Sequence, residues 1–410
     1  MLSTCLKIYQ HSITVLILIF LGGLCGYFFP QVVHYIKPIG DLFLSLIKMM
    51  IVPIVCVGII SSASNFGSSS NAVYLGVVTF LYFLVASSLS ALFGVVVANI
   101  FQPGLGLTER PAMFFSQVPD VNKFVEAKPT MNFTDFILNI IPTNPITALS
   151  EGKLLPILFF SLFLGIAISY VKNDNKDILI KSFSVLNDAF LWMINKIMFL
   201  IPVAVFSLMA YFVSETGLEV VYFAFKLLVV IIASYIFWIY IVLGFIVVVF
   251  GKVNYITYVK SIFPLQLLAL GSSSSLVCLP SHMMLCGKLG FKAGVYGFIL
   301  PLGANMHMNG SAIYYTITTI FFAQVFNIEI SFAVYVMMII TASLSAITTP
   351  GIPGLSLTII MVMVVANVPL YGLPLIFAID RILDMFTTTT NVIGNTVCVA
   401  VIDKMNIVKS

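Results

Sequence analysis

Charged side chains are scarce in this sequence. Only 8% of its 410 residues are charged, whereas 60% are hydrophobic. A soluble domain is usually about one quarter charged, so this chain lacks the polar side chains with which such a domain covers its surface. Several apolar runs exceed the roughly 20 residues that an α-helix needs to cross a bilayer. The sequence is therefore that of a polytopic membrane protein. Its net charge of +4 is too small to indicate a nucleic-acid partner.

Several chemical motifs are absent as well. The 6 cysteines contain no CxxC pair and lie in apolar surroundings, which favours buried free thiols. No GxxxxGK[ST] loop occurs, so nothing points to ATP as an energy source. There is no Ser/His/Asp or metal-spaced cluster, and the histidines fall in different segments: His11, His34, His282 and His307. We expect no enzymatic activity and no cofactor, apart from a coupling ion.

Long apolar runs predict eight spanning helices. They are Ser12–Phe29, Phe43–Ile60, Val73–Phe101, Leu154–Tyr170, Leu186–Val213, Val220–Phe250, Ala293–Phe322 and Tyr371–Val401. The first run is followed by PQVVHYIKP rather than by a small-residue cleavage site, so we interpret it as a retained helix and not as a signal peptide. Lys-rich short loops face the cytoplasm, and the lysine clusters here predict that both termini lie inside. The long polar stretch Gln102–Asp135 is expected outside.

Two further apolar segments are interrupted by glycine, proline and serine. Ser261–Gly287 contains four consecutive serines at 272–275, and Ser331–Val368 contains AITTPGIPGLS at 346–356. Each arm holds about half the residues of a crossing. Irregular backbone at membrane depth survives only where protein or a water-filled cavity surrounds it. Paired broken segments of this kind indicate the midplane binding site of a transporter. The alternative is a pair of kinked ordinary helices.

The serine run is predicted to form the tip of the first re-entrant hairpin. Its hydroxyls and free backbone N–H groups at a helix N-terminus suit an anionic group of a ligand. The alternative is close helix packing. Four serines in a row are poorly suited to packing, which uses one small residue in every four.

The last apolar run carries a polar stripe. Its members share one helical face: Asp380, Asp384, Thr387, Thr388, Asn391 and Asn395. Ionisable side chains within a membrane helix are costly unless they are paired or solvated, which favours a functional role. The alternative is a structural pair between an aspartate and Arg381.

A second polar island, GANMHMNGS at 303–311, interrupts the preceding run. Gly303 and Gly310 indicate an unwound turn whose carbonyls could face a cation. His307 is interpreted either as a hydrogen-bonded packing residue or as a ligand or proton carrier.

Taken together, several stretches resemble the dicarboxylate/amino acid:cation symporter family. The similar stretches are PIGDLFLSLIKMMIVP (38–53, second helix), IIPTNPITALSEGKLLPILFF (140–160, fourth helix), the serine run (first hairpin tip), TTPGIPG (348–354, second hairpin tip) and DRILDMFTTTTNVIGN (380–395, substrate helix). They occur in the order typical of the family and cover nearly the whole chain.

The resemblance implies an all-α polytopic fold with eight transmembrane helices plus two re-entrant hairpins. It also implies a homotrimer in the cell membrane, most simply a bacterial inner membrane, in which each subunit moves a transport domain against a fixed scaffold. Residues 1–250 would supply six helices, mostly scaffold and trimer contacts, with the third and sixth joining the transport domain. Residues 251–410 would form the transport core: hairpin 1, helix 7, hairpin 2 and helix 8.

The resemblance also assigns roles in substrate binding. Asp384 would hold the amino group of an amino acid, and Asn391 with the backbone around Ser274 and Ser275 would hold its α-carboxylate. The remaining positions would complete or close the site: Ser311, Thr388, Ile352 and Gly354. Thr387 stands where members with acidic substrates have an arginine, and a hydroxyl cannot replace its bidentate pairing with a carboxylate. Small neutral substrates are therefore expected.

The cation sites differ more strongly from those of the family. The family motif NMDGT reads HMNGS here, Asn395 replaces a second aspartate, and Phe83 and Ala86 replace ligands in the third helix. Sodium prefers oxygen ligands that include a carboxylate. The candidate sodium or proton residues are Ser87, Gly303, Asn305, His307, Asn309 and Asn395, together with the carbonyls of 346–349. His307 titrates near neutrality and could carry a coupling proton.

The sequence thus predicts a symporter that moves small, neutral amino acids by alternating access, driven by sodium or protons. An ion-uncoupled amino-acid exchanger is an alternative within the same class. An ion channel is an alternative from another class, but channels usually show rings of charges or carbonyls. The amino acid, the ion and the stoichiometry are left open by the sequence.

Overall fold

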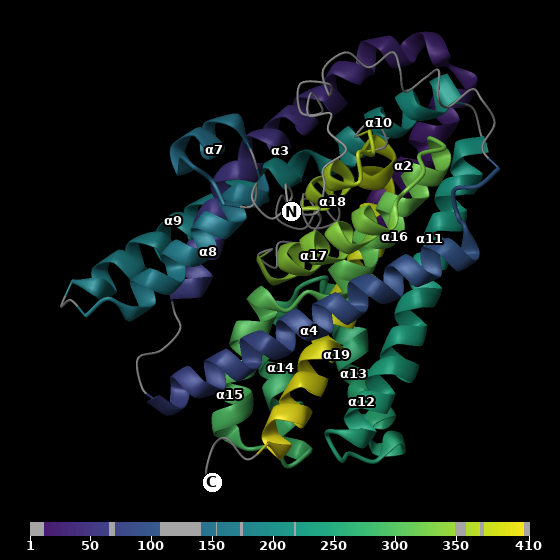
Figure 1. Cartoon of the computed structure of the whole chain (residues 1–410). Coiled ribbons are helices and arrows are strands. Elements are labelled where there is room, and N and C mark those ends of the chain that lie inside the picture. The colour runs from purple at the N-terminus through teal and green to yellow at the C-terminus, as the bar shows by residue number, and fades with distance from the viewer. Residues whose placement is uncertain are drawn as a thin grey trace, which may run out of the picture.

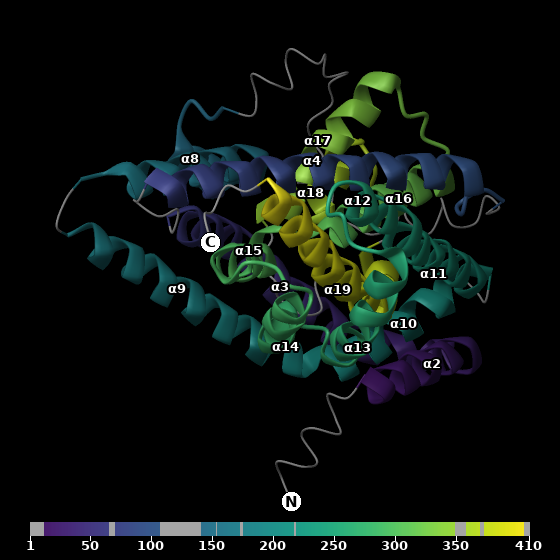
Figure 2. The same ribbon diagram turned by 90° about the horizontal axis from the view of Figure 1, so that it is seen from below.

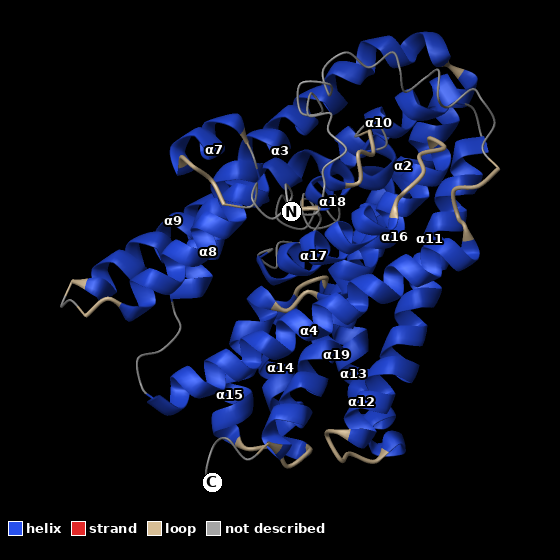
Figure 3. Cartoon of the chain, viewed as in Figure 1, coloured by secondary structure: helices blue, strands red, loops and turns tan. Residues whose placement is uncertain are grey.

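The computed structural model describes residues 12–64, 70–106, 141–152, 154–172, 175–216, 219–348, 358–369 and 373–405. Within these ranges the chain is helical and has no strand (Figures 1 and 3). Most of the predicted outer loop, Gln102–Asp135, lies outside the described residues, as does the tip of the second interrupted segment at 349–357. The helical content confirms the all-α prediction at the level of fold class.

One group of helices comes mainly from the first half of the chain. It comprises α2 (Ser12–Phe28), α3 (Pro30–Ser64), α7 (Pro145–Glu151), α8 (Leu154–Tyr170), α9 (Lys176–Ile197), the short 3₁₀ turn η2 (Met198–Leu200) and α10 (Ile201–Thr216). The single run predicted at Leu186–Val213 is therefore two helices. They are joined by the η2 turn, a tighter local winding that apolar composition does not reveal.

The packing of α2 on α10 depends on small residues spaced four apart. A Cβ atom on Gly22 would lie 2.5 Å from the carbonyl oxygen of Phe206, and one on Gly26 would overlap the backbone of Ala210. The G-x-x-x-G spacing thus lets the two backbones approach closely, as is common between membrane helices.

A serine of α10 is inserted into the backbone of α3. The Ser207 hydroxyl donates to the Ile36 carbonyl at 2.7 Å and accepts from the Gly40 N–H at 3.2 Å. It thereby bridges two backbone groups of α3 on either side of Pro38, which itself lacks an N–H. This contact ties α10 to α3.

The other group contains the helices that carry the candidate site. They are α4 (Ser70–Phe101), α11 (Glu219–Phe237), the π-helical turn η3 (Trp238–Val242), α12 (Leu243–Val249), α13 (Tyr255–Ser272), α14 (Ser275–Lys288), α15 (Ala293–Met306), α16 (Asn309–Val325), α17 (Phe332–Thr348), α18 (Ile359–Val365) and α19 (Leu373–Lys404). Two perpendicular views place α19 among α4, α13, α14 and α15 (Figures 1 and 2).

Burial separates α19 from the other long apolar helices. Among the residues that the structure describes, three helices are long and apolar enough to cross a membrane: Tyr74–Phe101, Tyr222–Val249 and Ile382–Lys404. The last is 89% buried within the protein, against 39% and 44% for the other two. A polar stripe on α19 therefore faces protein rather than lipid. The number of crossings stays a prediction.

The first interrupted segment folds as two helices joined at the serine run. Ser272 ends α13, Ser273 takes the left-handed conformation (φ +47°), and Ser274 is the N-cap of α14, accepting from the Val277 N–H at 3.4 Å. Small polar residues suit both positions. The arms contain 18 and 14 residues, so both are longer than the half crossing, about ten residues, that the sequence led us to expect.

The predicted run Ala293–Phe322 is broken where the polar island lies. Helix α15 ends at Met306, its last bond running from the His307 N–H to the Gly303 carbonyl, and α16 begins at Asn309. The Met308 N–H donates instead to the Ala346 carbonyl of α17 at 3.2 Å. The break therefore lies between the two glycines, which are themselves helical and serve close packing.

Candidate substrate and cation site

The site is centred on the point where the break between α15 and α16 meets the middle of α19. Gly310, at the start of α16, donates its N–H to Oδ1 of Asn391 at 2.7 Å. The amide nitrogen of Asn391 contacts the sulfur of Met308 at 3.1 Å. A thioether is a weak acceptor, so this amide remains available to a carboxylate that would bind it better. Asn391 is the residue that the resemblance assigns to the substrate α-carboxylate.

Thr387 lies one turn before Asn391 and is also buried. Its hydroxyl is 2.7 Å from the hydroxyl of Tyr235, which comes from α11. The same tyrosine hydroxyl is 3.2 Å from the Gly310 carbonyl. Tyr235 was not among the predicted site residues. A tyrosine in an apolar run counts as hydrophobic, and only the fold brings it to Thr387.

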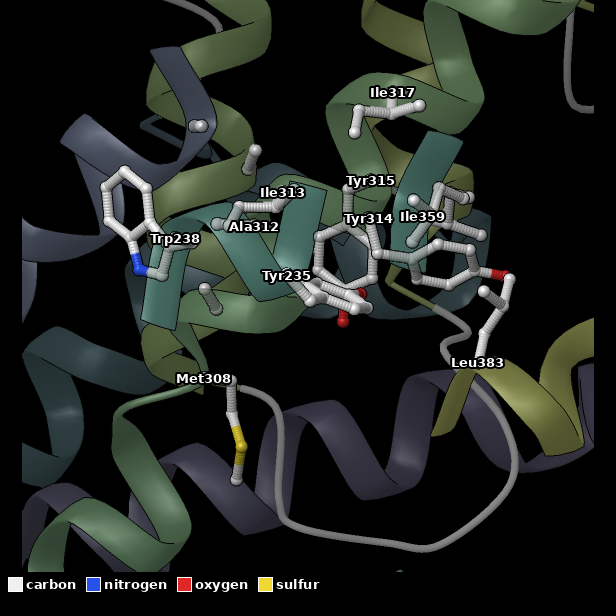
Figure 4. Close-up of a cluster of buried hydrophobic side chains, with 14 of the residues drawn as sticks. Tyr235, Trp238, Met308, Ala312, Ile313, Tyr314, Tyr315, Ile317, Ile359 and Leu383 are labelled. Atoms are coloured by element: carbon white, nitrogen blue, oxygen red, sulfur yellow. The ribbon is translucent and has the colours of Figure 1, made fainter. Parts of the chain in front are cut away.

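Aromatic hydroxyls also surround the aspartates of α19. Tyr314 donates to Oδ1 of Asp380 at 3.0 Å, and Asp380 is only 3% exposed. Tyr315, beside it on α16, accepts from the Thr358 hydroxyl at 2.5 Å. Figure 4 shows Tyr235, Tyr314 and Tyr315 in one buried cluster near Leu383 of α19.

Asp384, the predicted partner of a substrate amino group, lies half-buried one turn after Asp380. The predicted partner Arg381 is on α19, but its side chain is not among the described ones. Ser311 is buried at the start of α16, and Thr388 is buried on α19. Ile352 and Gly354 lie outside the described residues.

The serine tip can be located along α19 from two anchors. His282 of α14 bonds Thr396 at 2.8 Å, and the backbone N–H of Lys292, the N-cap of α15, donates to Asp403 at 2.9 Å. Along the chain His282 precedes Lys292, and Thr396 likewise precedes Asp403. The segment that starts with α14 therefore runs in the same direction as α19. Ser275 precedes His282 by seven residues, about 10 Å of helix. The same distance back from Thr396 reaches 389, close to Asn391.

The predicted cation or proton position is occupied by His307. Its imidazole is fully buried and stacks on Phe83 of α4, with ring centroids 4.5 Å apart and an interplanar angle of 6°. Tyr82 meets the ring edge-on at 6.0 Å. Nδ1 lies 2.8 Å from Oδ1 of Asn395, while Nε2 has no hydrogen-bond partner in the part of the chain that the structure describes. If the Asn395 oxygen accepts, Nδ1 carries the proton and Nε2 carries the lone pair.

Two carboxamides take the places where the resemblance leads one to expect carboxylates. The Asn395 side chain packs on Gly303, where an added Cβ would lie 2.7 Å from its Cγ. The Asn309 side chain packs on Gly394 in the same way, with the added Cβ 2.9 Å from its Cγ. Helices α15, α16 and α19 thus interlock through an asparagine on one helix and a glycine on its neighbour.

Other predicted positions are only partly joined to this cluster. Ser87 lies one turn after Phe83 on α4, is buried, and has a hydroxyl without a partner among the described residues. Thr79, one turn before Phe83, has the same properties and was not predicted. The Asn305 side chain donates from Nδ2 to the Pro301 carbonyl of its own helix, which leaves its Oδ1 and its backbone carbonyl as oxygen ligands for an ion.

No group of three or more His, Cys, Asp or Glu side chains in the described ranges could hold a metal ion.

Comparison with known proteins identifies the family. The model of the sodium:dicarboxylate symporter family matches residues 12–405. The chain belongs to this family. It is 31% identical to a proton/sodium-glutamate symport protein of Bacillus caldotenax over 393 residues, 95% of this chain and 92% of the relative. It is also 31% identical to a C4-dicarboxylate transport protein of Azorhizobium caulinodans, covering 97% and 89%. A proton/glutamate-aspartate symporter of Escherichia coli is 29% identical, covering 91% and 86%.

Membership confirms the predicted family and makes the chain a multi-pass protein of the cytoplasmic membrane. Two of these relatives are named as proton- or sodium-coupled symporters of glutamate or aspartate, and the third as a transport protein for C4-dicarboxylates. These substrates are acidic, whereas the residues of this chain led us to expect neutral ones.

Proposed function

We propose that this chain is a cation-coupled secondary transporter of small neutral α-amino acids. The observation that carries the proposal is the environment of Thr387. Its hydroxyl meets the hydroxyl of Tyr235 at 2.7 Å, and no guanidinium stands at this position to grip a second carboxylate. Burying an unpaired side-chain carboxylate there would be costly. A small neutral side chain carries no such cost.

The backbone of an amino acid would bind at groups already gathered in the core. Asp384 would receive the ammonium group, and the amide of Asn391 would leave the Met308 sulfur for the α-carboxylate. The N-terminus of α14 at Ser274 and Ser275, level with Asn391, would add backbone N–H groups and a positive helix end. Ser311, Thr388 and the 352–354 backbone would complete the site.

Movement would follow alternating access in a homotrimer. The group α4 and α11–α19 would move as the transport domain, while α2, α3 and α7–α10 would serve as the fixed scaffold and trimer contact. Support comes from family membership and from the two groups of helices described above. In this arrangement the third and sixth helices of the first 250 residues belong to the moving part.

For the coupling ion we propose a proton on His307. Nε2 is buried without a partner in the described structure, and the position corresponds to an asparagine in the family motif. The specific alternative is an exchanger without ion coupling, because Asn309 and Asn395 are neutral amides. A sodium ion held by carbonyls near Gly303, Asn305 and Ala346 is the third arrangement to be tested.

Uptake into proteoliposomes tests substrate and ion together. The purified chain is assayed with labelled serine, alanine, aspartate and malate under a sodium gradient, a proton gradient, or internal serine alone. Saturable serine or alanine uptake supports the proposal, and the gradient that drives accumulation names the ion. Sodium-driven uptake of aspartate or malate alone would refute it. Currents without saturable uptake would indicate a channel.

The role of His307 has its own test. His307→Asn restores the amide that the family motif has at this position, so the protein is expected to fold. We expect this variant to lose proton-driven accumulation while it keeps exchange of internal for external serine. His34→Asn, a change at an exposed histidine of α3, is the matched control. Unchanged pH dependence of transport in His307→Asn would sink the proton hypothesis.

A further inference from the structure

The hydroxyls of Tyr235 and Thr387 form a directed chain of hydrogen bonds. Tyr235 lies 2.7 Å from Oγ1 of Thr387 and 3.2 Å from the carbonyl oxygen of Gly310, and is 1% exposed. A carbonyl only accepts, and a tyrosine hydroxyl has a single proton. Both contacts form together only when Tyr235 donates to Gly310 and Thr387 donates to Tyr235.

The hydroxyl of Thr387 bonds differently from those of two neighbouring threonines on α19. Thr389 and Thr390 donate to the carbonyls of Met385 and Phe386, four residues earlier, as threonines in helices commonly do. Thr387 has no such bond, and its contact is with another helix. Its proton is used by Tyr235, so only the lone pairs of Oγ1 remain for a ligand.

We propose that Tyr235 is a specificity-determining residue that makes Thr387 an acceptor only. The site then selects amino acids whose side chain carries a hydrogen-bond donor, such as a hydroxyl, over side chains that only accept. This inference rests on the proposed function, since it places the substrate side chain beside Thr387. It also explains rejection of a carboxylate in a second way, because a carboxylate would meet lone pairs instead of a proton.

Two isosteric pairs of amino acids test whether Oγ1 of Thr387 accepts a hydrogen bond from the substrate side chain or donates one to it. Serine and 2-aminobutyrate differ by a hydroxyl in place of a methyl group, whereas O-methylserine and norvaline differ by an ether oxygen that only accepts. Each competes against labelled serine in proteoliposomes. One net hydrogen bond changes an inhibition constant by about fivefold to tenfold. In the wild type we expect serine to inhibit uptake with a constant lower than that of 2-aminobutyrate by this factor. O-methylserine and norvaline should have equal inhibition constants.

Variants then assign the effect to Tyr235. Tyr235→Phe releases the Thr387 proton, so O-methylserine should gain about fivefold relative to norvaline while serine keeps its advantage. Thr387→Val should remove the serine advantage. Tyr258→Phe is the control, because Tyr258 is equally buried and its hydroxyl donates to the Ile239 carbonyl at 3.1 Å, elsewhere in the core. In this variant the ratio of inhibition constants within each pair, serine to 2-aminobutyrate and O-methylserine to norvaline, should equal that of the wild type.

The outcomes separate the two levels of the argument. If the wild type transports only aspartate or a dicarboxylate, the proposed function and this inference fall together. If serine is transported but the wild type prefers O-methylserine to norvaline, Thr387 donates to ligands and only the inference falls. The same holds if Tyr235→Phe leaves the O-methylserine ratio unchanged. The wild-type comparison needs no variant, so poor folding of Tyr235→Phe would leave the inference open to refutation.

Discussion

The contact between Gly303 and Asn395 makes a sharp prediction about the predicted cation position. Alanine at 303 would place Cβ 2.7 Å from Cγ of Asn395 and closer still to its side-chain oxygen. The carboxamide must then leave His307, to which it is bonded at 2.8 Å. Overpacking costs about 1–3 kcal/mol, and the lost hydrogen bond about 0.5–1.5 kcal/mol. Replacing glycine by alanine within a helix by itself stabilises the folded state by about 0.5–1 kcal/mol. The net expectation for Gly303→Ala is a destabilisation of about 2 kcal/mol.

Thermal unfolding of the purified protein in detergent measures this change. The expected shift is a fall in Tm of several degrees. Gly297→Ala is the matched control on the same helix, because nothing lies within 4 Å of the Cβ that it would add. Its Tm should be unchanged or slightly higher. Proton-driven accumulation of serine should fall in Gly303→Ala and persist in Gly297→Ala.

A double-mutant cycle tests whether Asn395 is the cause. In an Asn395→Ala background the carboxamide is gone, so Gly303→Ala should cost little beyond the background. The coupling between the two changes is then about 1–3 kcal/mol. Additive effects on Tm would refute the reasoning, because they would show that the alanine meets some other group.

Two further changes test the packing that holds the candidate site and its scaffold. Asp403→Ala removes the acceptor of the Lys292 N–H at the start of α15; we expect a loss of about 1 kcal/mol, seen as a lower Tm, and a smaller loss in Asp403→Asn. Gly26→Leu forces α2 away from Ala210 of α10, and we expect a loss of about 3 kcal/mol or more and a poor yield of folded protein. Gly23→Leu is its control, since the Cβ at 23 would have one side-chain contact at 3.8 Å. Equal yields of the two leucine variants would contradict the close approach of α2 and α10.

Apolar composition predicted the positions of the helices, and polar residues predicted the breaks at the serine run and around His307, but the turns η2 and η3 were not predicted. The runs Ser12–Phe29 and Leu154–Tyr170 correspond to α2 and α8 almost to the residue. The η2 turn at Met198–Leu200 and the π turn at Trp238–Val242 lie inside runs that remain apolar throughout, so hydropathy cannot show them. Within the π turn, the Ile239 carbonyl accepts from the hydroxyl of Tyr258. That partner comes from another helix and is supplied by tertiary packing.

Polar residues in apolar runs were the strongest guide to the site. The stripe on α19 and the island around His307 were recognised because polar groups are costly at membrane depth. Tyr235 was missed for the converse reason: its ring suits an apolar helix, and its partner Thr387 is 152 residues away. Thr79 was missed because a lone hydroxyl can bond its own helix. The sequence therefore identifies groups that need a partner better than it identifies the partners.

Several differences from the family pattern replace charged side chains by neutral ones. By that resemblance, the chain has Thr387 in place of a cationic side chain, and Asn309 and Asn395 in place of two anionic ones. A carboxylate buried in a moving domain must be neutralised before it crosses a low-dielectric region, which obliges the transporter to carry a cation. The amides of Asn309 and Asn395 are neutral without one. Under the proposed function these two positions therefore need no bound cation, which is why we assign the coupling to His307 or to backbone carbonyls.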